Sequence, residues 1–371
     1  MKLSTSKNEL RTALQKLAKA TPTRSTLPIL SCALFTVRDN ETVLRSTDLE
    51  ISMVVRLPAS IEEPGSAAIP LSTLLEITNE LQDSRITISV NERNKVELIT
   101  DTGIYDLMGK PAEEFPAIPE VDNSRTVDME ASTLKAIFEK TSFAVSHDDL
   151  KPALTGVYMK FSPEALTAVA TDGHRLVRYI VNDFKGGNFE GDLIVPRKFI
   201  NLIQSVADTN EEVHLWIGDN HLTALIGEDR FYTRIIDELF PNYEGVLPTD
   251  NNKILTVSRN EILGAVRRVS IFANKATNQI ALRLDTDETY LSTEDPEKAT
   301  KAEEKLSCDF QGEPLTIGYN ASYLKDILSH LDESDVIVKL NTPISAALFY
   351  PATQPEGRDI TMLLMPIRLN D

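Results

Sequence analysis

The chain has 371 residues, 42% of them hydrophobic and 25% charged, which is the composition of an ordinary soluble protein with two or three domains. Its two cysteines, Cys32 and Cys308, lie far apart and form no CxxC pair, which argues against a disulfide framework or a zinc site. The net charge of −18 argues against a protein that grips nucleic acid by neutralising phosphates, because such proteins are usually basic.

An amphipathic helix is predicted three times along the chain. Apolar residues recur at i, i+3, i+4 and i+7 from Leu10, and similar stripes begin at Leu134 and Ile262. Ser or Thr before each stripe offers an N-cap. The copies read SKNELRTALQKLAKA from Ser6, ASTLKAIFEKTSFAV from Ala131 and SRNEILGAVRRVSIFA from Ser258.

A second helix recurs in the same order, starting near Ile69, Val195 and Tyr319. The copies are therefore 126 residues (69 to 195) and then 124 residues (195 to 319) apart. Runs of alternating apolar and polar residues, broken by Asn, Asp and Gly, lie between and after the helices, and this period of two is typical of antiparallel hairpins. Two helices and a hairpin series at a near-constant period indicate a repeated domain rather than chance matches.

Polar, turn-rich stretches separate the repeats, one at Asp122-Asn123-Ser124 and the other at Thr249-Asp250-Asn251-Asn252. We therefore expect an α+β fold in three similar domains, residues 1–123, 124–250 and 251–371. Each domain should contain two helices and antiparallel sheets.

Motifs for catalysis are missing: the sequence has no GxxxxGK[ST], GxGxxG, HExxH or GxSxG. His214 and His221 could lie on facing strands of one hairpin, but without Cys or carboxylate support we expect no metal site and no cofactor. The stretch Asp172-Gly173-His174-Arg175 brings an acid and a histidine together. Thr47-Asp48-Leu49 stands at the corresponding place of the first copy, which favours a structural turn in which Gly173 supplies a positive φ.

Each opening helix carries a cation six positions after its first apolar residue: Lys16, Lys140 and Arg268. At 100° per residue this position lies about 240° from the start of the stripe, so we expect these side chains on the face turned away from the sheet. One such cation is ordinarily a solvated surface residue. Recurrence in an acidic chain favours one positive surface, which would reconcile the net charge with nucleic-acid binding.

Short strings in a fixed order carry a family resemblance: Thr26-Leu27-Pro28-Ile29-Leu30, Thr47-Asp48-Leu49-Glu50, Ala170-Thr171-Asp172-Gly173-His174-Arg175-Leu176, Ile194-Val195-Pro196-Arg197-Lys198, Phe240-Pro241-Asn242-Tyr243, Val246-Leu247-Pro248 and Met365-Pro366-Ile367-Arg368-Leu369. Each string is short, but together, in this order and spacing, they are highly specific. Along its whole length the chain resembles the β subunit family of bacterial DNA polymerase III, the β sliding clamps.

The resemblance implies three pseudo-repeated DNA-clamp domains per chain and a homodimer, joined head to tail, that forms a ring with helices lining the hole. It implies a non-catalytic processivity factor that encircles duplex DNA without sequence specificity. It also implies that the polymerase III catalytic subunit, the clamp loader, other polymerases and repair proteins dock a peptide rich in Gln, Leu and Phe into a cleft between the second and third domains.

Site residues follow from the resemblance in three groups. Arg24, Arg197 and Lys198 join the three helix cations as DNA-lining residues. The dimer interface places Ile271 and Phe272 against Tyr105 and Leu107 of a second chain. The residues that match the partner-peptide cleft are Leu154, Thr171, Gly173, His174, Arg175, Leu176, Pro241, Val246, Tyr323, Ile344, Leu364, Met365, Pro366 and Ile367.

Three departures from the family pattern bear on affinity for partners. Gly245 stands where some relatives carry Arg, Pro152-Ala153 where aromatic residues can occur, and Asn370-Asp371 extends past the usual Arg-Leu end. None of them threatens the family resemblance.

Two other interpretations stay open, an enzyme that acts on nucleic acid through the Asp172/His174 loop and a monomeric scaffold that binds peptides but no DNA. Metal-dependent turnover would reveal the first, and the mass in solution would separate the second from a ring. The N-terminus lacks the apolar core of a signal peptide, and no run approaches the roughly 18–20 apolar residues of a membrane span, so we expect a cytoplasmic protein that does not bind membranes.

Overall fold

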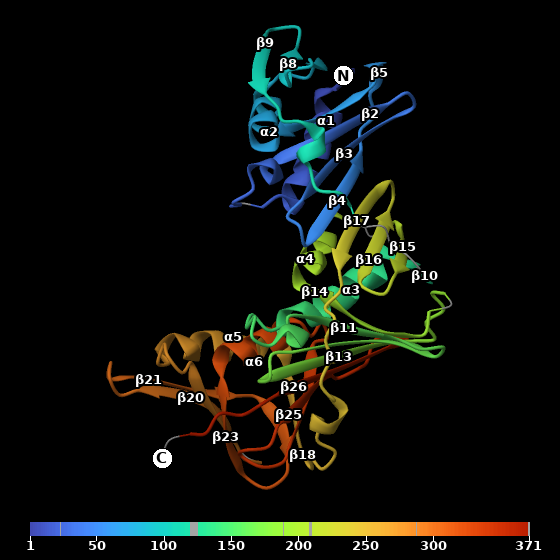
Figure 1. Cartoon of the computed structure of the whole chain (residues 1–371). Coiled ribbons are helices and arrows are strands. Elements are labelled where there is room, and N and C mark those ends of the chain that lie inside the picture. Colours follow the sequence, from blue (N-terminus) through green and yellow to red (C-terminus); the bar gives the residue numbers. More distant parts are fainter. Residues whose placement is uncertain (23, 119–124, 188, 208–209, 287, 370–371) are drawn as a thin grey trace. The chain divides into compact units, whose positions relative to one another are not determined.

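The computed structural model describes residues 1–22, 24–118, 125–187, 189–207, 210–286 and 288–369, and the chain forms two compact units (Figure 1). Unit 1 comprises Met1–Lys135, Gly186–Phe189 and Lys198–Ile235. Unit 2 comprises Ala136–Lys185, Glu190–Arg197 and Ile236–Asp371. The predicted boundary at residues 122–124 lies outside the described residues, whereas the one at 249–252 lies in irregular chain.

Unit 1 contains two antiparallel sheets. The first has the order β5-β1-β7-β8-β9, with bounds β1 Lys2–Ser6, β5 Ser60–Glu63, β7 Arg85–Val90, β8 Lys95–Ile99 and β9 Ile104–Met108. The second has the order β10-β15-β16-β17-β4-β3-β2-β6, with bounds β2 Cys32–Arg38, β3 Glu41–Thr47, β4 Ile51–Arg56, β6 Gly65–Pro70, β10 Arg125–Glu130, β15 Glu212–Ile217, β16 His221–Ile226 and β17 Asp229–Arg234. The pairing of β17 with β4, in which Thr233 lies opposite Ile51, joins strands of the second repeat to the sheet of the first.

Helices α1 (Lys7–Leu17) and α2 (Leu71–Glu80) pack together in unit 1 (Figure 1). Ser6 caps α1 in a capping box with Glu9, which satisfies free N–H groups at the helix start. The predicted apolar stripe from Leu10 is buried, so this prediction is confirmed. The other helices of unit 1 are α4 (Arg197–Val206), whose first residue falls in unit 2, and the short helices η1 (Ala18–Ala20), η2 (Pro28–Ser31) and η3 (Ala112–Glu114).

Unit 2 also contains two antiparallel sheets. The larger has the order β14-β11-β12-β13-β26-β25-β24-β18-β22, with bounds β11 Gly156–Phe161, β12 Ala165–Thr171, β13 Arg175–Asn182, β14 Gly191–Pro196, β18 Lys253–Ser258, β22 Cys308–Gln311, β24 Asp335–Leu340, β25 Ala347–Pro351 and β26 Arg358–Leu364. The smaller has the order β21-β20-β19-β23, with bounds β19 Gln279–Leu284, β20 Thr289–Asp295, β21 Thr300–Leu306 and β23 Leu315–Asn320. Pairing of β13 with β26, in which Leu176 lies opposite Leu363, joins the second repeat to the third.

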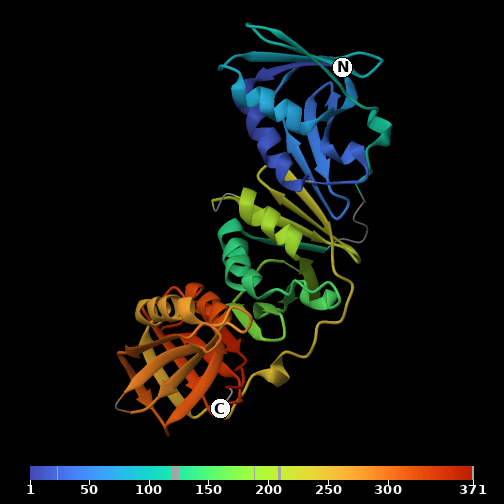
Figure 2. The same ribbon diagram turned by 90° about the vertical axis from the view of Figure 1, so that its left-hand side faces the viewer.

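Helices α5 (Arg259–Val269) and α6 (Ala321–Ser329) lie side by side in unit 2 (Figure 2). The predicted stripe of α5, which begins at Ile262, is buried, as are Leu134 and Ile137 of α3 (Ala131–Thr141). None of the helices in the described part of the chain has the length and hydrophobicity needed to cross a membrane. The short helices are η4 Ser142–Ala144, η5 Pro152–Leu154, η6 Glu244–Val246 and η7 Ser270–Phe272.

The predicted threefold repeat of two helices and antiparallel strands is confirmed, with helix pairs α1/α2, α3/α4 and α5/α6. The strands of the second repeat divide between the units: β10 and β15–β17 belong to unit 1, and β11–β14 belong to unit 2. Two units arise from three repeats because strand pairing continues from one repeat into the next.

Candidate functional site

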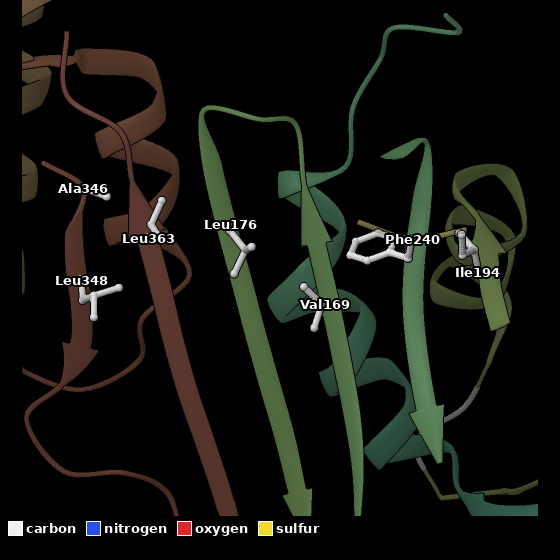
Figure 3. Packing of buried hydrophobic residues seen from close by; sticks show 7 residues of the cluster. All are labelled: Val169, Leu176, Ile194, Phe240, Ala346, Leu348 and Leu363. Atoms are coloured by element: carbon white, nitrogen blue, oxygen red, sulfur yellow. The ribbon is translucent and has the colours of Figure 1, made fainter. Parts of the chain in front are cut away.

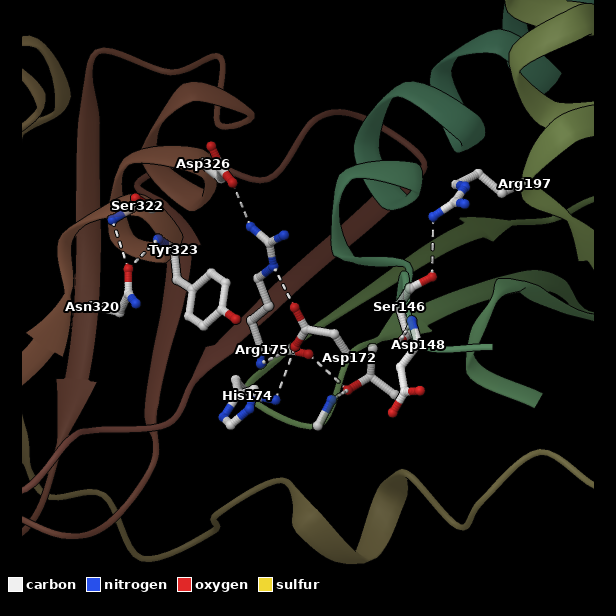
Figure 4. Close-up of polar contacts among 12 residues, drawn as sticks. Ser146, Asp148, Asp172, His174, Arg175, Arg197, Asn320, Ser322, Tyr323 and Asp326 are labelled. Atoms are coloured by element: carbon white, nitrogen blue, oxygen red, sulfur yellow. Dashed lines mark hydrogen bonds and ion pairs between the residues drawn. The ribbon is translucent and has the colours of Figure 1, made fainter. Parts of the chain in front are cut away.

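The predicted peptide cleft begins at the turn between β12 and β13, where side chains hold the backbone (Figure 4). Asp172 Oδ1 accepts hydrogen bonds from the N–H groups of His174 (2.9 Å) and Arg175 (3.0 Å). Thr171 Oγ1 accepts from the Gly173 N–H (3.1 Å) and donates to the Arg175 carbonyl (2.7 Å). Gly173 has φ +90°, as the sequence predicts. The turn is therefore fixed before any ligand binds.

Arg175 joins this turn to helix α6. Its side chain is 9% exposed, and its Nε donates to Asp172 Oδ2 (3.1 Å) while its Nη1 donates to Asp326 Oδ2 (2.6 Å). The guanidinium also lies over the rings of Phe143 (5.3 Å) and Tyr323 (4.7 Å). Both oxygens of the Asp172 carboxylate are thus engaged within the protein, which argues against an acid–base role for this loop.

His174 and Tyr323 form the exposed edge of the turn. Their rings lie 5.7 Å apart and nearly parallel, at 20°. The N-cap residue of α6, Asn320, accepts hydrogen bonds from the N–H groups of Ser322 and Tyr323, which fixes the helix start beneath the ring. Burial, aided by the charge of Asp172, raises the pKa of Tyr323, so its hydroxyl is a neutral hydrogen-bond donor.

An apolar cluster adjoins the turn, and we call it the groove cluster (Figure 3). Figure 3 shows its side chains on strands β12, β13, β14, β25 and β26 and in the irregular chain at Phe240 and Ala346: Val169, Leu176, Ile194, Phe240, Ala346, Leu348 and Leu363. Partly buried residues pack against it: Ala153, Leu154, Tyr158, Ile236, Tyr243, Leu247 and Tyr350. Tyr158 stacks on Phe240 with ring centroids 4.8 Å apart, and burial raises the pKa of Tyr158 to about 12. The cluster supplies an apolar floor rather than titrating groups.

Apolar side chains also remain exposed around this floor. Val246 is 56% exposed, Ile344 68% and Met365 40%. Pro241 is exposed as well, whereas Pro366 is half-buried. A buried apolar floor bordered by exposed apolar side chains is typical of a surface that binds another molecule.

The structure separates the predicted cleft residues into two kinds. Leu154, Gly173, His174, Pro241, Val246, Tyr323, Ile344, Met365, Pro366 and Ile367 are exposed or half-buried, whereas Thr171, Arg175 and Leu176 are buried and support the turn and floor. Leu364 is a correction: its side chain is 0% exposed, and its neighbour Leu363 belongs to the groove cluster instead. Because side chains alternate between the faces of a strand, an error of one residue changes the face.

The aromatic part of the floor was not predicted. In the sequence Phe240 and Tyr243 belong to a family string, and Tyr158 stands in none of the motifs. Phe240-Pro241 follows the last strand of the second repeat, as Phe115-Pro116 follows the last strand of the first. This recurrence could have indicated that Phe240 is a site residue.

The three helix cations are ion-paired. Lys16 Nζ lies 2.5 Å from Asp229 Oδ2, and burial raises the pKa of that carboxyl although Lys16 opposes the shift. Arg268 Nη2 lies 2.7 Å from Glu304 Oε2 and its side chain is 63% exposed.

Lys140 corrects the prediction that the three cations form one positive surface, because it is buried. It is only 6% exposed, and its Nζ donates to the His330 carbonyl (3.0 Å) and to Asp332 Oδ1 (2.6 Å). The helical phase was right, but this face of α3 is covered by the loop that follows α6.

The three loop and helix-start cations differ in their surroundings. Arg24 is exposed between η1 and η2. Arg197, the first residue of α4, donates to the Ser146 carbonyl (3.3 Å) and contacts the His147 ring. Lys198 lies between two acids of the β3–β4 turn, Asp48 Oδ2 (3.0 Å) and Glu50 Oε2 (2.8 Å). Lys16, Arg24 and Lys198 belong to unit 1, and Lys140, Arg197 and Arg268 to unit 2.

The predicted dimer residues lie at two sheet edges. Ile271 (67% exposed) and Phe272 (43% exposed) form η7, and Thr300 Oγ1 at the start of β21 donates to the Phe272 carbonyl (3.1 Å). Tyr105 and Leu107 are half-buried on β9, the last strand of its sheet.

The possible histidine pair is not formed. His214 on β15 lies opposite Leu225, and His221 on β16 lies opposite Arg234, so the two rings do not face each other. His214 Nδ1 instead contacts Asp128 Oδ1 (2.7 Å). Among the described residues, no three His, Cys, Asp or Glu side chains are grouped so as to hold a metal ion.

Family models cover nearly the whole chain. The model of the DNA polymerase III beta subunit, N-terminal domain, matches residues 1–119, the central-domain model matches 128–242, and the C-terminal-domain model matches 244–368. The three models follow the three repeats.

Individual relatives agree. The chain is 33% identical over 362 residues to the beta sliding clamp of Pseudomonas putida, with 96% of each chain covered, and 30% identical over 372 residues to that of Vibrio cholerae, with full coverage of both. A crystal structure of the DNA polymerase sliding clamp from Pseudomonas aeruginosa with ligand superposes with a TM-score of 0.94 at 31% identity, covering both chains fully. Another structure of the Pseudomonas aeruginosa clamp, bound to griselimycin, gives a TM-score of 0.93 at 31% identity over the same coverage.

Proposed function

The chain belongs to the β-subunit family of DNA polymerase III and is a non-catalytic sliding clamp of DNA replication, and we propose that the groove of unit 2 is where its partners dock. The observation that carries this proposal is the groove cluster with exposed Val246, Ile344 and Met365 around it. An extended peptide can bury Leu and Phe side chains there, each worth about 1.5–3 kcal/mol when fully buried.

The family implies DNA and polymerases as partners. We propose more specifically that the catalytic subunit of polymerase III, the clamp loader, other polymerases and repair proteins compete for this one groove, in the cytoplasm. An enzyme acting through Asp172 and His174 is disfavoured because Asp172 is fully engaged by the turn and by Arg175.

We further propose that two chains close the ring through strands β9 and β21. Two junctions between repeats already exist within the chain, where β17 pairs with β4 and β26 pairs with β13. Each joins the last strand of one repeat to the outer strand of the preceding repeat. The corresponding strands β9 and β21 are still at sheet edges. By the same pattern, β21 of one chain would pair with β9 of another and make the third kind of junction. This head-to-tail contact closes into a ring with two chains.

The side chains at these edges support the same interface. Ile271 and Phe272 lie beside β21 and are exposed, and Tyr105 and Leu107 project from β9. Exposed apolar groups next to an unpaired strand edge are a liability for a monomer and are suited to a partner strand.

For DNA we propose weak contacts to phosphates only. Arg24, Lys198 and Arg268 are the exposed members of the predicted set, and Lys16, Arg197, Lys198 and Arg268 can exchange their present partners for phosphates. Lys140 is reassigned to a structural role because it is buried. Such contacts carry no sequence information and weaken with salt, which suits a ring that must slide.

Retention on circular and linear DNA tests the proposed ring. Clamp is loaded on nicked circular duplex with clamp loader and ATP, the circle is cut once, and the bound clamp is measured by gel filtration. We expect retention on the circle and loss after cutting, because a ring leaves through a free end. Equal retention on both forms would contradict topological binding, and a monomeric mass with intact peptide binding would favour the scaffold.

A further inference from the structure

The C-terminal segment, residues 365–369, is hydrogen-bonded to the β12–β13 turn and to β23, and we call it the wall of the proposed groove. The Met365 N–H donates to the His174 carbonyl (2.8 Å) in the β12–β13 turn. Two residues later the Ile367 N–H donates to the Gly318 carbonyl (2.9 Å) in β23, with which it forms an isolated antiparallel bridge. Residue 318 therefore lies directly against the segment.

The same contact exists in all three repeats, but with a different residue on the strand. In the first repeat Ala68 and Lys110 exchange two backbone hydrogen bonds (3.0 and 2.8 Å), and in the second the Ile236 N–H donates to the Ile194 carbonyl (3.0 Å). Ala68 and Ile194 each contribute a side chain to an apolar cluster. Gly318 is the member of the series that has no side chain.

The space for a side chain at Gly318 is occupied. A Cβ there would lie 2.6 Å from the Ile367 carbonyl oxygen and 2.7 Å from Leu369 Cδ2. A leucine side chain can rotate away, but a backbone carbonyl can only retreat together with its neighbours Pro366 and Met365. The glycine is needed here for close approach of two backbones, not for an unusual φ.

We propose that Gly318 is a positioning residue of the groove, because the lack of a side chain lets Ile367 and Leu369 lie on β23 and so holds Met365 and Pro366 against the turn at His174. The inference rests on the proposed role of the groove. It adds that the shape of this wall is set by a residue outside the groove itself.

The test compares Gly318→Ala with Gly357→Ala. A Cβ at Gly357, also in unit 2, would meet no atom within 4 Å, and its φ of +65° adds backbone strain of its own, so the control makes the same chemical change and costs some stability without a clash. Binding of a fluorescein-labelled peptide containing Gln, Leu and Phe is followed by anisotropy. We expect Gly318→Ala to weaken binding about tenfold or more and the control to change it by less than about twofold.

A spectroscopic signal separates displacement of the wall from general damage. In protein labelled with ¹³C at the methionine methyl groups, the Met365 signal is assigned by its absence in Met365→Leu. We expect this signal to shift in Gly318→Ala before any peptide is added, and to be unchanged in Gly357→Ala. The mass in solution should match that of the parent chain in both variants.

A shortened chain that lacks residues 367–371 completes the test. It removes the Ile367 carbonyl and the Leu369 side chain, which a Cβ at residue 318 would meet, and it keeps Met365 and Pro366. In this background Gly318→Ala should change neither peptide affinity nor the Met365 signal. Equal effects of Gly318→Ala in the full and shortened chains, or no effect in the full chain, would overturn the proposal. If the parent chain bound no peptide, the groove assignment would fail instead, and the Met365 signal would still decide the role of Gly318.

Discussion

The β3–β4 turn of unit 1 and the β12–β13 turn of unit 2 have the same backbone arrangement. Asp48 Oδ1 accepts from the N–H groups of Glu50 (3.0 Å) and Ile51 (2.9 Å), and Thr47 Oγ1 accepts from the Leu49 N–H (3.1 Å) and donates to the Ile51 carbonyl (2.8 Å). These bonds reproduce, one for one, those made by the turn that begins at Thr171. A Phe-Pro pair follows in both repeats, and Phe115 lies in an apolar cluster as Phe240 does.

The two regions differ in what surrounds the turn. Two residues before the threonine stands Arg45 in unit 1 and Val169 in unit 2. Arg45 lies over the Phe115 ring (5.1 Å) and donates to the Pro116 carbonyl (2.7 Å), whereas Val169 leaves the floor in unit 2 apolar. The same turn is thus followed by a charged, filled contact in unit 1 and by an apolar cluster in unit 2, so side chains rather than backbone distinguish the two regions.

The largest effect should come from removing the C-terminal segment that adjoins the proposed groove of unit 2. Deleting Met365–Asp371 should abolish measurable peptide binding, a loss of about 100-fold or more, because the exposed apolar edge disappears with it. The measurement is peptide anisotropy, with the mass in solution as a check on assembly. As a control in the counterpart region, Leu49→Ala should leave affinity unchanged. Unaltered binding after the deletion would place the peptide elsewhere.

The strand junctions allow a second test. The strand after each turn, β4 or β13, is paired with a strand of the next repeat, whereas the corresponding strand β21 is at the edge of its sheet. Replacing Ile271 and Phe272 together with Ala should convert the proposed dimer into folded monomers that still bind peptide, since the groove cluster contains neither residue. Sedimentation equilibrium measures the mass. Leu239→Ala, at a residue that is 92% exposed in the same unit, is the matched control and should remain dimeric. A double variant with the parent mass would show that the interface is wrong.

A smaller effect should come from the position of positive φ in the two turns, where unit 2 has glycine and unit 1 has leucine. Gly173 and Leu49 both have positive φ, +90° and +79°. Gly173→Ala should lower the free energy of unfolding by about 1 kcal/mol, because a Cβ is strained in this conformation even though it would meet open space. Leu49→Ala should change it by less than about 0.5 kcal/mol, since Leu49 already carries a Cβ there. Urea unfolding measures both, and equal effects would contradict the assignment of strain.

The repeated elements were predictable from the sequence because they depend on local pattern. The stripe from Leu10, the cap at Ser6 and the positive φ of Gly173 each follow from a few neighbouring residues. The buried state of Lys140 was not predictable, because it depends on a loop at Asp332 almost two hundred positions away. The error at Leu364 has a different cause: the family string identified the segment but not which face of the strand meets the groove.

The weakest effect concerns the acids of the turn in unit 1 and depends on pH. Burial lowers the pKa of Lys198, but hydrogen bonds to Glu50 and Asp48 outweigh it and raise the pKa above 10.5. A lysine whose pKa is raised on folding contributes stability that is complete below pH 10.5 and is lost as the pH rises through the folded value. Lys198 is 49% exposed, so solvent screening limits the contribution to a few tenths of a kcal/mol.

Urea unfolding at pH 9 and pH 11.5 tests this with two substitutions. The stability of the parent chain relative to Lys198→Arg should decrease from pH 9 to pH 11.5, because arginine keeps its charge. The small advantage in stability that the parent chain has over Lys198→Gln at pH 9 should disappear at pH 11.5. Taking differences between variants cancels the titration of other lysines and tyrosines. The counterpart acid Asp172 is paired with Arg175, which keeps its charge, so the turn of unit 2 should show no such alkaline loss. An advantage over Lys198→Gln that persisted at pH 11.5 would mean that packing of the Lys198 stem, and not its charge, stabilises the turn.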